Sequence, residues 1–101
     1  MSMMATALLS SNGKLQFWQV VGSQLWSAWK SSDDPNASWI GWGPFVPSPG
    51  PVDNIAAGNL SDGRVQLFAT SGGTTLTIWK QTTNEDAGWI SGNGEAWQNF
   101  P

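Results

Sequence analysis

The chain has 101 residues, of which 11% are charged, and its formal net charge is −3. It contains neither cysteine nor histidine, which excludes disulfides, cysteine-based zinc sites and histidine acid–base chemistry. Its four cations are spread along the chain and do not form the basic patch that nucleic-acid backbones bind, so we expect no nucleic-acid partner.

No stretch approaches the roughly 18–20 apolar residues that span a membrane, so we expect no membrane insertion. The apolar run near the start is short and lacks a basic flank, so it does not predict a signal peptide. We therefore expect synthesis in the cytoplasm, and the sequence leaves open whether the protein is later released from the cell.

Short strand-like segments follow one another from the start of the chain. In residues 14–20, KLQFWQV, Leu15 and Phe17 point to one side of a strand and Gln16 and Trp18 to the other. Glycine-bearing turns separate this segment from its neighbours. Four strands are expected in the first half: residues 3–9, 14–20, 25–30 and 38–42. No segment shows the 3.6-residue period of a helix.

The second half of the chain repeats the first at an offset of fifty. The segment SNGKLQFW at residues 11–18 is answered by SDGRVQLF at residues 61–68. Identical pairs include Gly13 with Gly63, Gln16 with Gln66, Gly22 with Gly72, Trp29-Lys30 with Trp79-Lys80, and Trp39-Ile40 with Trp89-Ile90. About five extra residues precede the end of the second half, so that Trp42…Phe45 answers Trp97…Phe100. We infer a duplication with units at residues 1–50 and 51–101.

A repeat of about fifty residues made of four short antiparallel strands is typical of a β-propeller blade. The small residues of each first strand suit a crowded position near the ring axis: Ala5, Ala7, Ala56 and Ala57. Two blades cannot close a ring and would leave apolar faces open. We therefore expect an all-β homo-oligomer with two blades per chain, a six-bladed trimer being favoured over an eight-bladed tetramer or a four-bladed dimer. If the chain is a fragment, five or seven blades also become available.

Each unit carries a polar turn with glycine and a basic residue, then alternating strand residues, then Trp-Lys and a further tryptophan. In the second unit these are Ser61-Asp62-Gly63-Arg64, Trp79-Lys80 and Trp89. The pattern resembles the repeat of bacterial and fungal β-propeller lectins, namely the tectonin-like group and the fucose- or galactose-binding propeller lectins. The resemblance implies multivalent, non-catalytic binding of glycans in pockets between blades, without a cofactor. The alternative is a structural or protein-binding propeller scaffold without sugar binding.

Tryptophan suits sugar binding because indole offers an apolar face for pyranose C–H groups together with an N–H donor. Tryptophans that an aromatic residue matches within the gapless part of the alignment, residues 11–41 with 61–91, are expected to pack blade against blade: Trp18, Trp29, Trp39, Trp79 and Trp89. The expected sugar-binding residues lie near the loops of one rim: Trp26, Trp42 and Trp97, with Asn93, Glu95 and Gln98 as polar partners. Strand residues that could also point into a groove between blades are Lys14, Gln16, Arg64 and Gln66.

Neither catalysis nor metal binding is expected. Adjacent carboxylates at positions 33–34 and 85–86 could serve glycoside hydrolysis, but they lie in polar loops on the side opposite the expected ligand rim. The first of these loops resembles the Asp-box of sialidases, yet Pro35 stands where that motif requires glycine. The first pair with Asn36 could bind Ca²⁺, but a turn closed by Asx hydrogen bonds is favoured.

Overall fold

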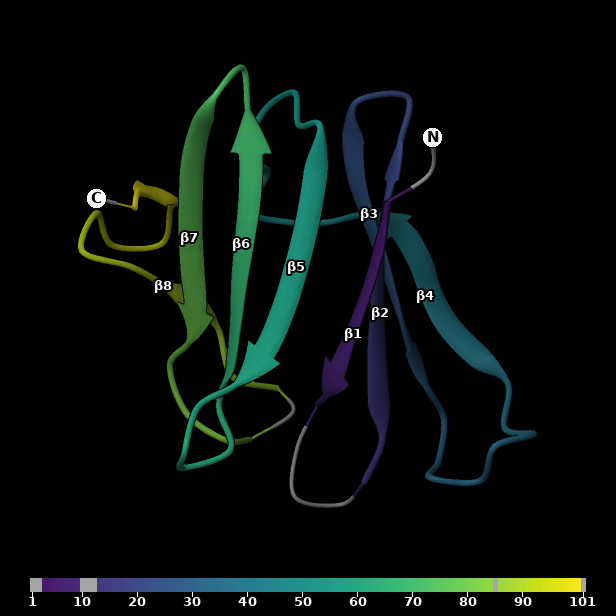
Figure 1. Ribbon diagram of the computed structural model, residues 1–101. Helices are drawn as coiled ribbons and strands as arrows, with labels where there is room; N and C mark the ends of the chain where they lie inside the picture. The colour runs from purple at the N-terminus through teal and green to yellow at the C-terminus, as the bar shows by residue number, and fades with distance from the viewer. Residues whose placement is uncertain (1–2, 10–12, 85, 101) are drawn as a thin grey trace.

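In the computed structural model, two antiparallel sheets hold all the regular structure of the described residues, which are 3–9, 13–84 and 86–100 (Figure 1). The first sheet has the order β1-β2-β3-β4, and the second has the order β5-β6-β7-β8 with the short β9 also pairing with β7. The strands are β1 Met4–Leu8, β2 Leu15–Val21, β3 Gln24–Lys30, β4 Trp39–Pro44, β5 Asn54–Asn59, β6 Val65–Ser71, β7 Thr74–Lys80, β8 Trp89–Ile90 and β9 Gln98–Asn99. The predicted all-β class with two consecutive antiparallel units is confirmed.

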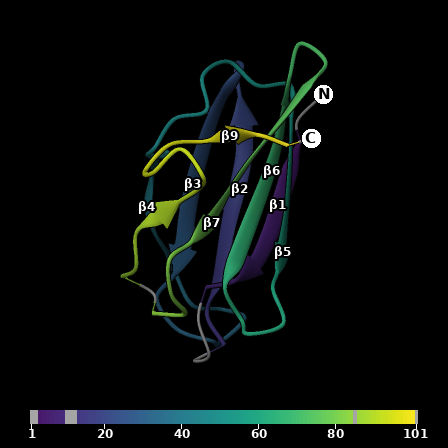
Figure 2. The same ribbon diagram turned by 90° about the vertical axis from the view of Figure 1, so that its left-hand side faces the viewer.

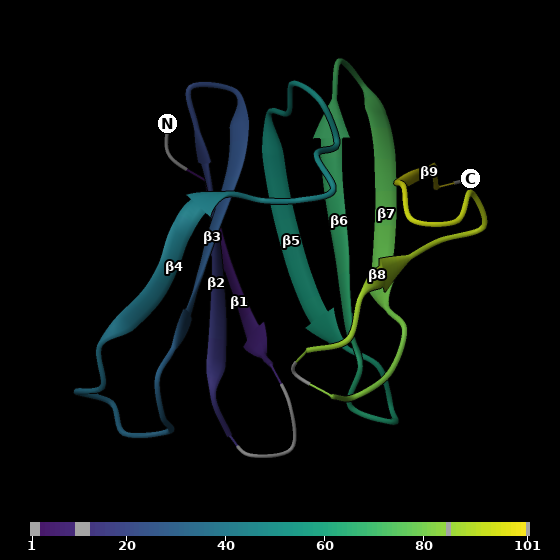
Figure 3. The same cartoon turned by 180° about the vertical axis from the view of Figure 1, so that it is seen from behind.

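The two sheets stack as layers. In the view along the stacking direction, the second sheet lies in front of the first (Figure 2). The connection from β4 to β5 crosses from one layer to the other (Figure 3). The first strands of the two sheets, β1 and β5, lie next to each other, and their small side chains allow this close approach.

The hydrogen bonds at the end of each unit pair the residues that the sequence alignment matches. The backbone N–H of Phe45 donates to the carbonyl of Leu25 at 2.8 Å, and that of Phe100 donates to the carbonyl of Thr75 at 2.8 Å. The acceptors are fifty residues apart in the chain and the donors fifty-five, so the extra residues of the second unit leave its final pairing unchanged.

Those extra residues leave the sheet at a β-bulge. In the first sheet, Gly41 and Trp42 together lie opposite the middle of β3, where the register shifts. In the second sheet, the corresponding strand stops after Ile90 and pairing with β7 resumes at Gln98. The sequence did not predict β9 because two residues after a loop are too few to show alternation.

The repeat makes the faces of the two sheets equivalent. We call the face that carries Phe17 in the first sheet and Leu67 in the second the leading face, and the face that carries Trp18 and Phe68 the trailing face. The leading face of the second sheet packs on the trailing face of the first. The buried residues of this core are Ala7, Trp18, Leu25, Phe45, Val52, Ile55, Val65, Leu67, Ala69, Ile78 and Trp97.

Aromatic rings join the two layers. Trp18 is fully buried, and its ring meets that of Trp89 edge to face at a centroid distance of 6.0 Å. Phe45 lies on the same ring of Trp89 at 5.2 Å. The predicted packing of Trp18 and Trp89 between the units is therefore confirmed.

Three other tryptophans expected to pack between units are less covered. Trp39 is 44% exposed on the leading face of the first sheet, and Trp79 is half-buried on the trailing face of the second. Within one chain no second layer covers either face, because two sheets cover only one face of each other. Trp29 lies on the covered face, yet it is 36% exposed because it lines a cavity. For Trp39 and Trp79, packing against another blade therefore stays a prediction, because the faces that carry them are the outer faces of the single chain.

The repeated Trp-Lys pair ends in a buried lysine that holds the following polar loop. The Lys30 ammonium donates to the carbonyls of Asp34 at 2.9 Å and Pro35 at 2.7 Å, and it lies 5.6 Å from the ring centroid of Trp39. Lys80 repeats the arrangement with the Asn84 carbonyl. The recurrence of this lysine in both units therefore has a structural cause.

Replacing Lys30 by methionine is expected to lower the free energy of unfolding by about 1.5–3 kcal/mol, because charge-assisted hydrogen bonds to two loop carbonyls are lost. Urea unfolding followed by circular dichroism measures the change. Lys14→Met removes the same charge from a half-buried position directly before β2 and serves as the control. Equal losses in both variants would mean that the loop carbonyls contribute nothing specific.

Candidate binding pocket between the sheets

Trp26 and Trp42 lie together on the leading face of the first sheet. Their ring centroids are 5.3 Å apart, and Trp42 also stacks on Phe17 at 6.1 Å. Trp42 is 49% exposed, whereas Trp26 is half-buried and its indole N–H donates to the Gln24 side chain at 3.2 Å. This pair belongs to an uncovered sheet face, and the described residues that line the hollow beside Trp42 all come from strands, not from loops.

Trp97 occupies a different environment from its counterpart Trp42. It is only 8% exposed, and its indole N–H donates to the Pro47 carbonyl at 2.8 Å. Its ring packs edge to face on Phe45 at 6.3 Å. Trp97 is therefore a core residue here and offers no free ring face, because the first sheet covers the leading face of the second.

The three polar residues predicted beside Trp97 mostly close their own loop. The Asn93 side-chain amide donates to the Trp97 carbonyl at 3.3 Å, and the Gly92 N–H donates to the Gln98 side chain. Glu95 is exposed in the same loop. The structure brings Asn93, Trp97 and Gln98 together, but on the other sheet from Trp26 and Trp42.

Two of the strand residues predicted to point into a groove between blades, Arg64 and Gln16, have different surroundings in the structure. The Arg64 guanidinium donates to the Asp62 carboxylate at 2.7 Å within the turn before β6. The Arg64 backbone N–H and then its side chain lower the pKa of Asp62. Gln16, in contrast, is buried at the floor of a pocket between the two sheets.

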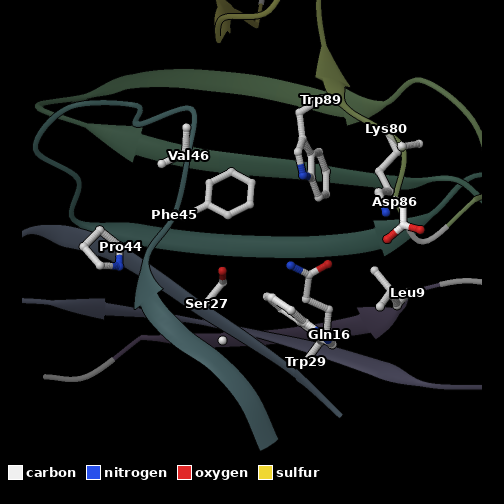
Figure 4. A pocket seen from close by; sticks show the side chains of 12 residues that line it. Leu9, Gln16, Ser27, Trp29, Pro44, Phe45, Val46, Lys80, Asp86 and Trp89 are labelled. Atoms are coloured by element: carbon white, nitrogen blue, oxygen red, sulfur yellow. The ribbon is translucent and has the colours of Figure 1, made fainter. Parts of the chain in front are cut away.

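This pocket has a volume of about 310 Å³. Strands β2 and β3 and the end of β4 supply one wall, and the end of β7, the polar loop after it and β8 supply the other (Figure 4). Its aromatic lining includes the rings of Trp29, Phe45 and Trp89. Its polar lining consists of Gln16, Ser27, Lys80 and Asp86.

Gln16 lacks a partner at one polar atom. Its side chain is 6% exposed and points toward the space between the sheets (Figure 4), and no hydrogen bond reaches its Oε1 in the described structure. Its repeat counterpart Gln66 is satisfied differently, since it donates to the Thr77 hydroxyl at 3.0 Å. A buried acceptor without a partner costs about 1–3 kcal/mol, so a ligand donor at this place would be favourable.

Charged groups lie at the loop end of the pocket. Lys80 is 2% exposed and donates to the Asn84 carbonyl at 3.2 Å, with its ammonium 5.7 Å from the ring centroid of Trp89. The exposed Asp86 has its backbone N–H bonded to the Asn84 side chain at 2.9 Å, which fixes the loop that presents its carboxylate. The pocket therefore combines apolar ring faces with acceptors for hydroxyl groups.

Sequence reasoning missed most of this pocket. The sequence predicted only packing for Trp29 and Trp89 and no site role for Lys80, although all three line the cavity. The loop with Asp86 was placed opposite the ligand rim, whereas it borders the pocket. The useful signal was the alternation in β2, which directs Gln16 toward the neighbouring unit.

The candidate Ca²⁺ loop adopts the Asx turn that the sequence favoured. Asp34 Oδ1 accepts the backbone N–H of Asn36 at 2.8 Å. Among the described residues, no three His, Cys, Asp or Glu side chains gather as a metal site. The described structure also has no helix with the length and hydrophobicity needed to cross a bilayer. Position 85 lies outside the described residues, so the second carboxylate pair has no structural account.

A scan against protein-family models finds no match to this chain, and a search among curated proteins finds no relative.

Proposed function

We propose that the chain is a non-catalytic carbohydrate-binding protein whose ligand lies in the pocket between its two sheets. The observation that carries the proposal is the buried, unpartnered Oε1 of Gln16 in a pocket lined by indole rings. A pyranose has one face of C–H groups that packs on an indole ring, and hydroxyl groups at its edge that donate to buried acceptors. A pocket of about 310 Å³ suits a ligand of this small size.

The two sheets would then act as two blades of a β-propeller whose ring is completed by further copies of the chain. A six-bladed trimer remains the favoured assembly, followed by an eight-bladed tetramer and a four-bladed dimer. Two uncovered sheet faces and the adjacency of β1 and β5 support this proposal. A ring presents several weak sites on one rigid body, so glycan-coated surfaces would be bound with avidity.

Replacing Gln16 by leucine is expected to weaken sugar binding at least tenfold while leaving stability unchanged or higher. The reason is that leucine removes an acceptor needed by the ligand and, at the same time, a buried polar group without a partner. A glycan array, followed by titration calorimetry with the sugars that bind, measures the first effect. Fucose- and galactose-bearing glycans are the first probes, because the sequence resembles lectins of those classes.

Gln81→Leu makes the same chemical change at an exposed loop position and is expected to bind like the original chain. Unchanged sugar binding by the Gln16→Leu variant would show that the sugar does not bind in this pocket. A blank array from a folded protein would favour a structural or protein-binding propeller instead.

A further inference from the structure

We propose that a second copy of this chain docks its second sheet on the first sheet, trailing face to leading face, and that the junction forms a second ligand pocket from two copies. The docking follows from the repeat and the packing within the chain. The ligand assignment of the second pocket rests on the proposed function.

A hollow of about 370 Å³ lies on the leading face of the first sheet and is lined by Phe17, Gln19, Ala28, Trp39 and Trp42. Their repeat counterparts are Leu67, Ala69, Ile78, Trp89 and Trp97. In the second sheet four of these counterparts are buried core residues and Trp89 packs against the same core. The same hollow therefore exists twice, and in the second sheet it is already filled.

The side chains that fill the hollow of the second sheet are Trp18 and Phe45 of the first. Both rings pack on Trp89, and Phe45 also packs on Trp97. Trp18 and Phe45 themselves meet edge to face at 6.3 Å. The empty hollow thus requires two aromatic rings in this arrangement.

The repeat supplies those rings on the other uncovered face. Phe68 and Phe100 are the counterparts of Trp18 and Phe45, and they also meet edge to face, at 5.4 Å. Phe100 is 52% exposed on the trailing face of the second sheet. This face and the hollow are the two outer surfaces of the stacked layers, so the rings that fill the hollow come from another copy.

The exposed apolar area supports a copy of the chain as the occupant. Met4, Leu8 and Val21 lie on the same leading face as Trp39 and Trp42, and each is at least 41% exposed. Contiguous apolar surface of this kind marks an interaction site. Because two different faces meet, the contact is heterologous and closes into a ring when the rotation per copy permits.

The junction would also bring together the counterparts of the pocket residues. One copy contributes Gln66, Thr77 and Trp79, the counterparts of Gln16, Ser27 and Trp29. The second copy contributes Lys30, Asn36 and Trp39, the counterparts of Lys80, Asp86 and Trp89. This second pocket would take the same class of neutral sugar with lower affinity, because it has no carboxylate at position 36 and its Gln66 amide already donates to Thr77.

The test of docking uses one charged variant on each face. Trp42→Asp blocks the leading face and Phe100→Asp blocks the trailing face, so each variant alone is expected to be a folded monomer of 10.8 kDa. An equimolar mixture is expected to form a one-to-one dimer, since each variant keeps the face that the other has lost. Light scattering after size exclusion measures the masses, and circular dichroism verifies that both variants are folded.

Val46→Asp changes a large apolar side chain that is 78% exposed and lies outside both faces, in the connection between β4 and β5, and it is expected to keep the mass of the original assembly. A monomeric original chain at micromolar concentration, or folded variants that stay monomeric when mixed, would overturn the docking.

The second pocket is tested by counting bound L-fucose or D-galactose in calorimetry. The assembled protein is expected to bind two sugars per chain and the Phe100→Asp monomer one. One sugar per chain in the assembled protein would overturn the second pocket while leaving the docking in place. If neither sugar binds to any form, both the second pocket and the proposed function fail, and the masses alone decide the docking.

Discussion

Replacing Trp18 by alanine is expected to remove a large part of the free energy of unfolding. Trp18 is fully buried between the sheets, where its ring contacts both Phe45 and Trp89. Truncating a buried large aromatic side chain to alanine costs about 3–5 kcal/mol, and a small domain has about 5–15 kcal/mol in total. A chain with only two layers has no second core to compensate.

Trp18→Phe is the matched control, because phenylalanine occupies the equivalent position in the second unit, at Phe68. It is expected to lose less than half as much stability, since a ring remains between the sheets and the indole N–H that disappears has no partner. Urea unfolding followed by circular dichroism compares the two variants. Similar losses in both would mean that the indole itself, not the ring contact between sheets, holds the layers together.

Replacing Gly41 by alanine is expected to damage both stability and ligand binding. Gly41 has a φ of +73°, and a Cβ built there would lie 2.3 Å from the ring of Trp29. The backbone conformation alone costs about 1–2 kcal/mol for a residue with a side chain. The clash adds to this cost, and its relief requires Trp29 to move within the pocket that it lines.

Gly50→Ala separates the two effects. Gly50 has a φ of +83°, and a Cβ there would meet nothing within 4 Å. It is expected to lose stability for backbone reasons only and to bind sugar normally, whereas Gly41→Ala also weakens binding. Denaturant unfolding and calorimetry with the same sugar measure both quantities. Normal binding in Gly41→Ala would show that the position of Trp29 does not matter to the ligand.

The strands could be predicted because their signals are local. Alternation in KLQFWQV and RVQLFAT, and glycines at Gly22 and Gly72 with positive φ, fix the strand faces and the turns without reference to the rest of the fold. The repeat then reinforced each weak signal by presenting it twice. Only β9 was not predicted, because its two residues carry no strand signal and its pairing depends on the strand β7.

The candidate site was harder to predict because exposure depends on which face receives a neighbour. Trp42 and Trp97 hold the same place in the repeat and have the same side chain, yet one is 49% exposed and the other 8%. The difference comes from the first sheet, which covers one of them. Gln16 and Gln66 each lie opposite a tryptophan and differ for a local reason. Gln66 donates to Thr77, whereas the first unit has Ser27 at the position of Thr77.

The bulge at Gly41 and Trp42 has a consequence for protein engineering. The second unit inserts its extra residues at this place and still restores the pairing of Phe100 with Thr75, as Phe45 pairs with Leu25. The second unit thus shows that the fold accommodates about five inserted residues at this place without a change in strand register. The exposed loop at residues 92–96, which already holds the extra length, is consequently an entry point for grafted peptides, and each copy of the chain would display one graft.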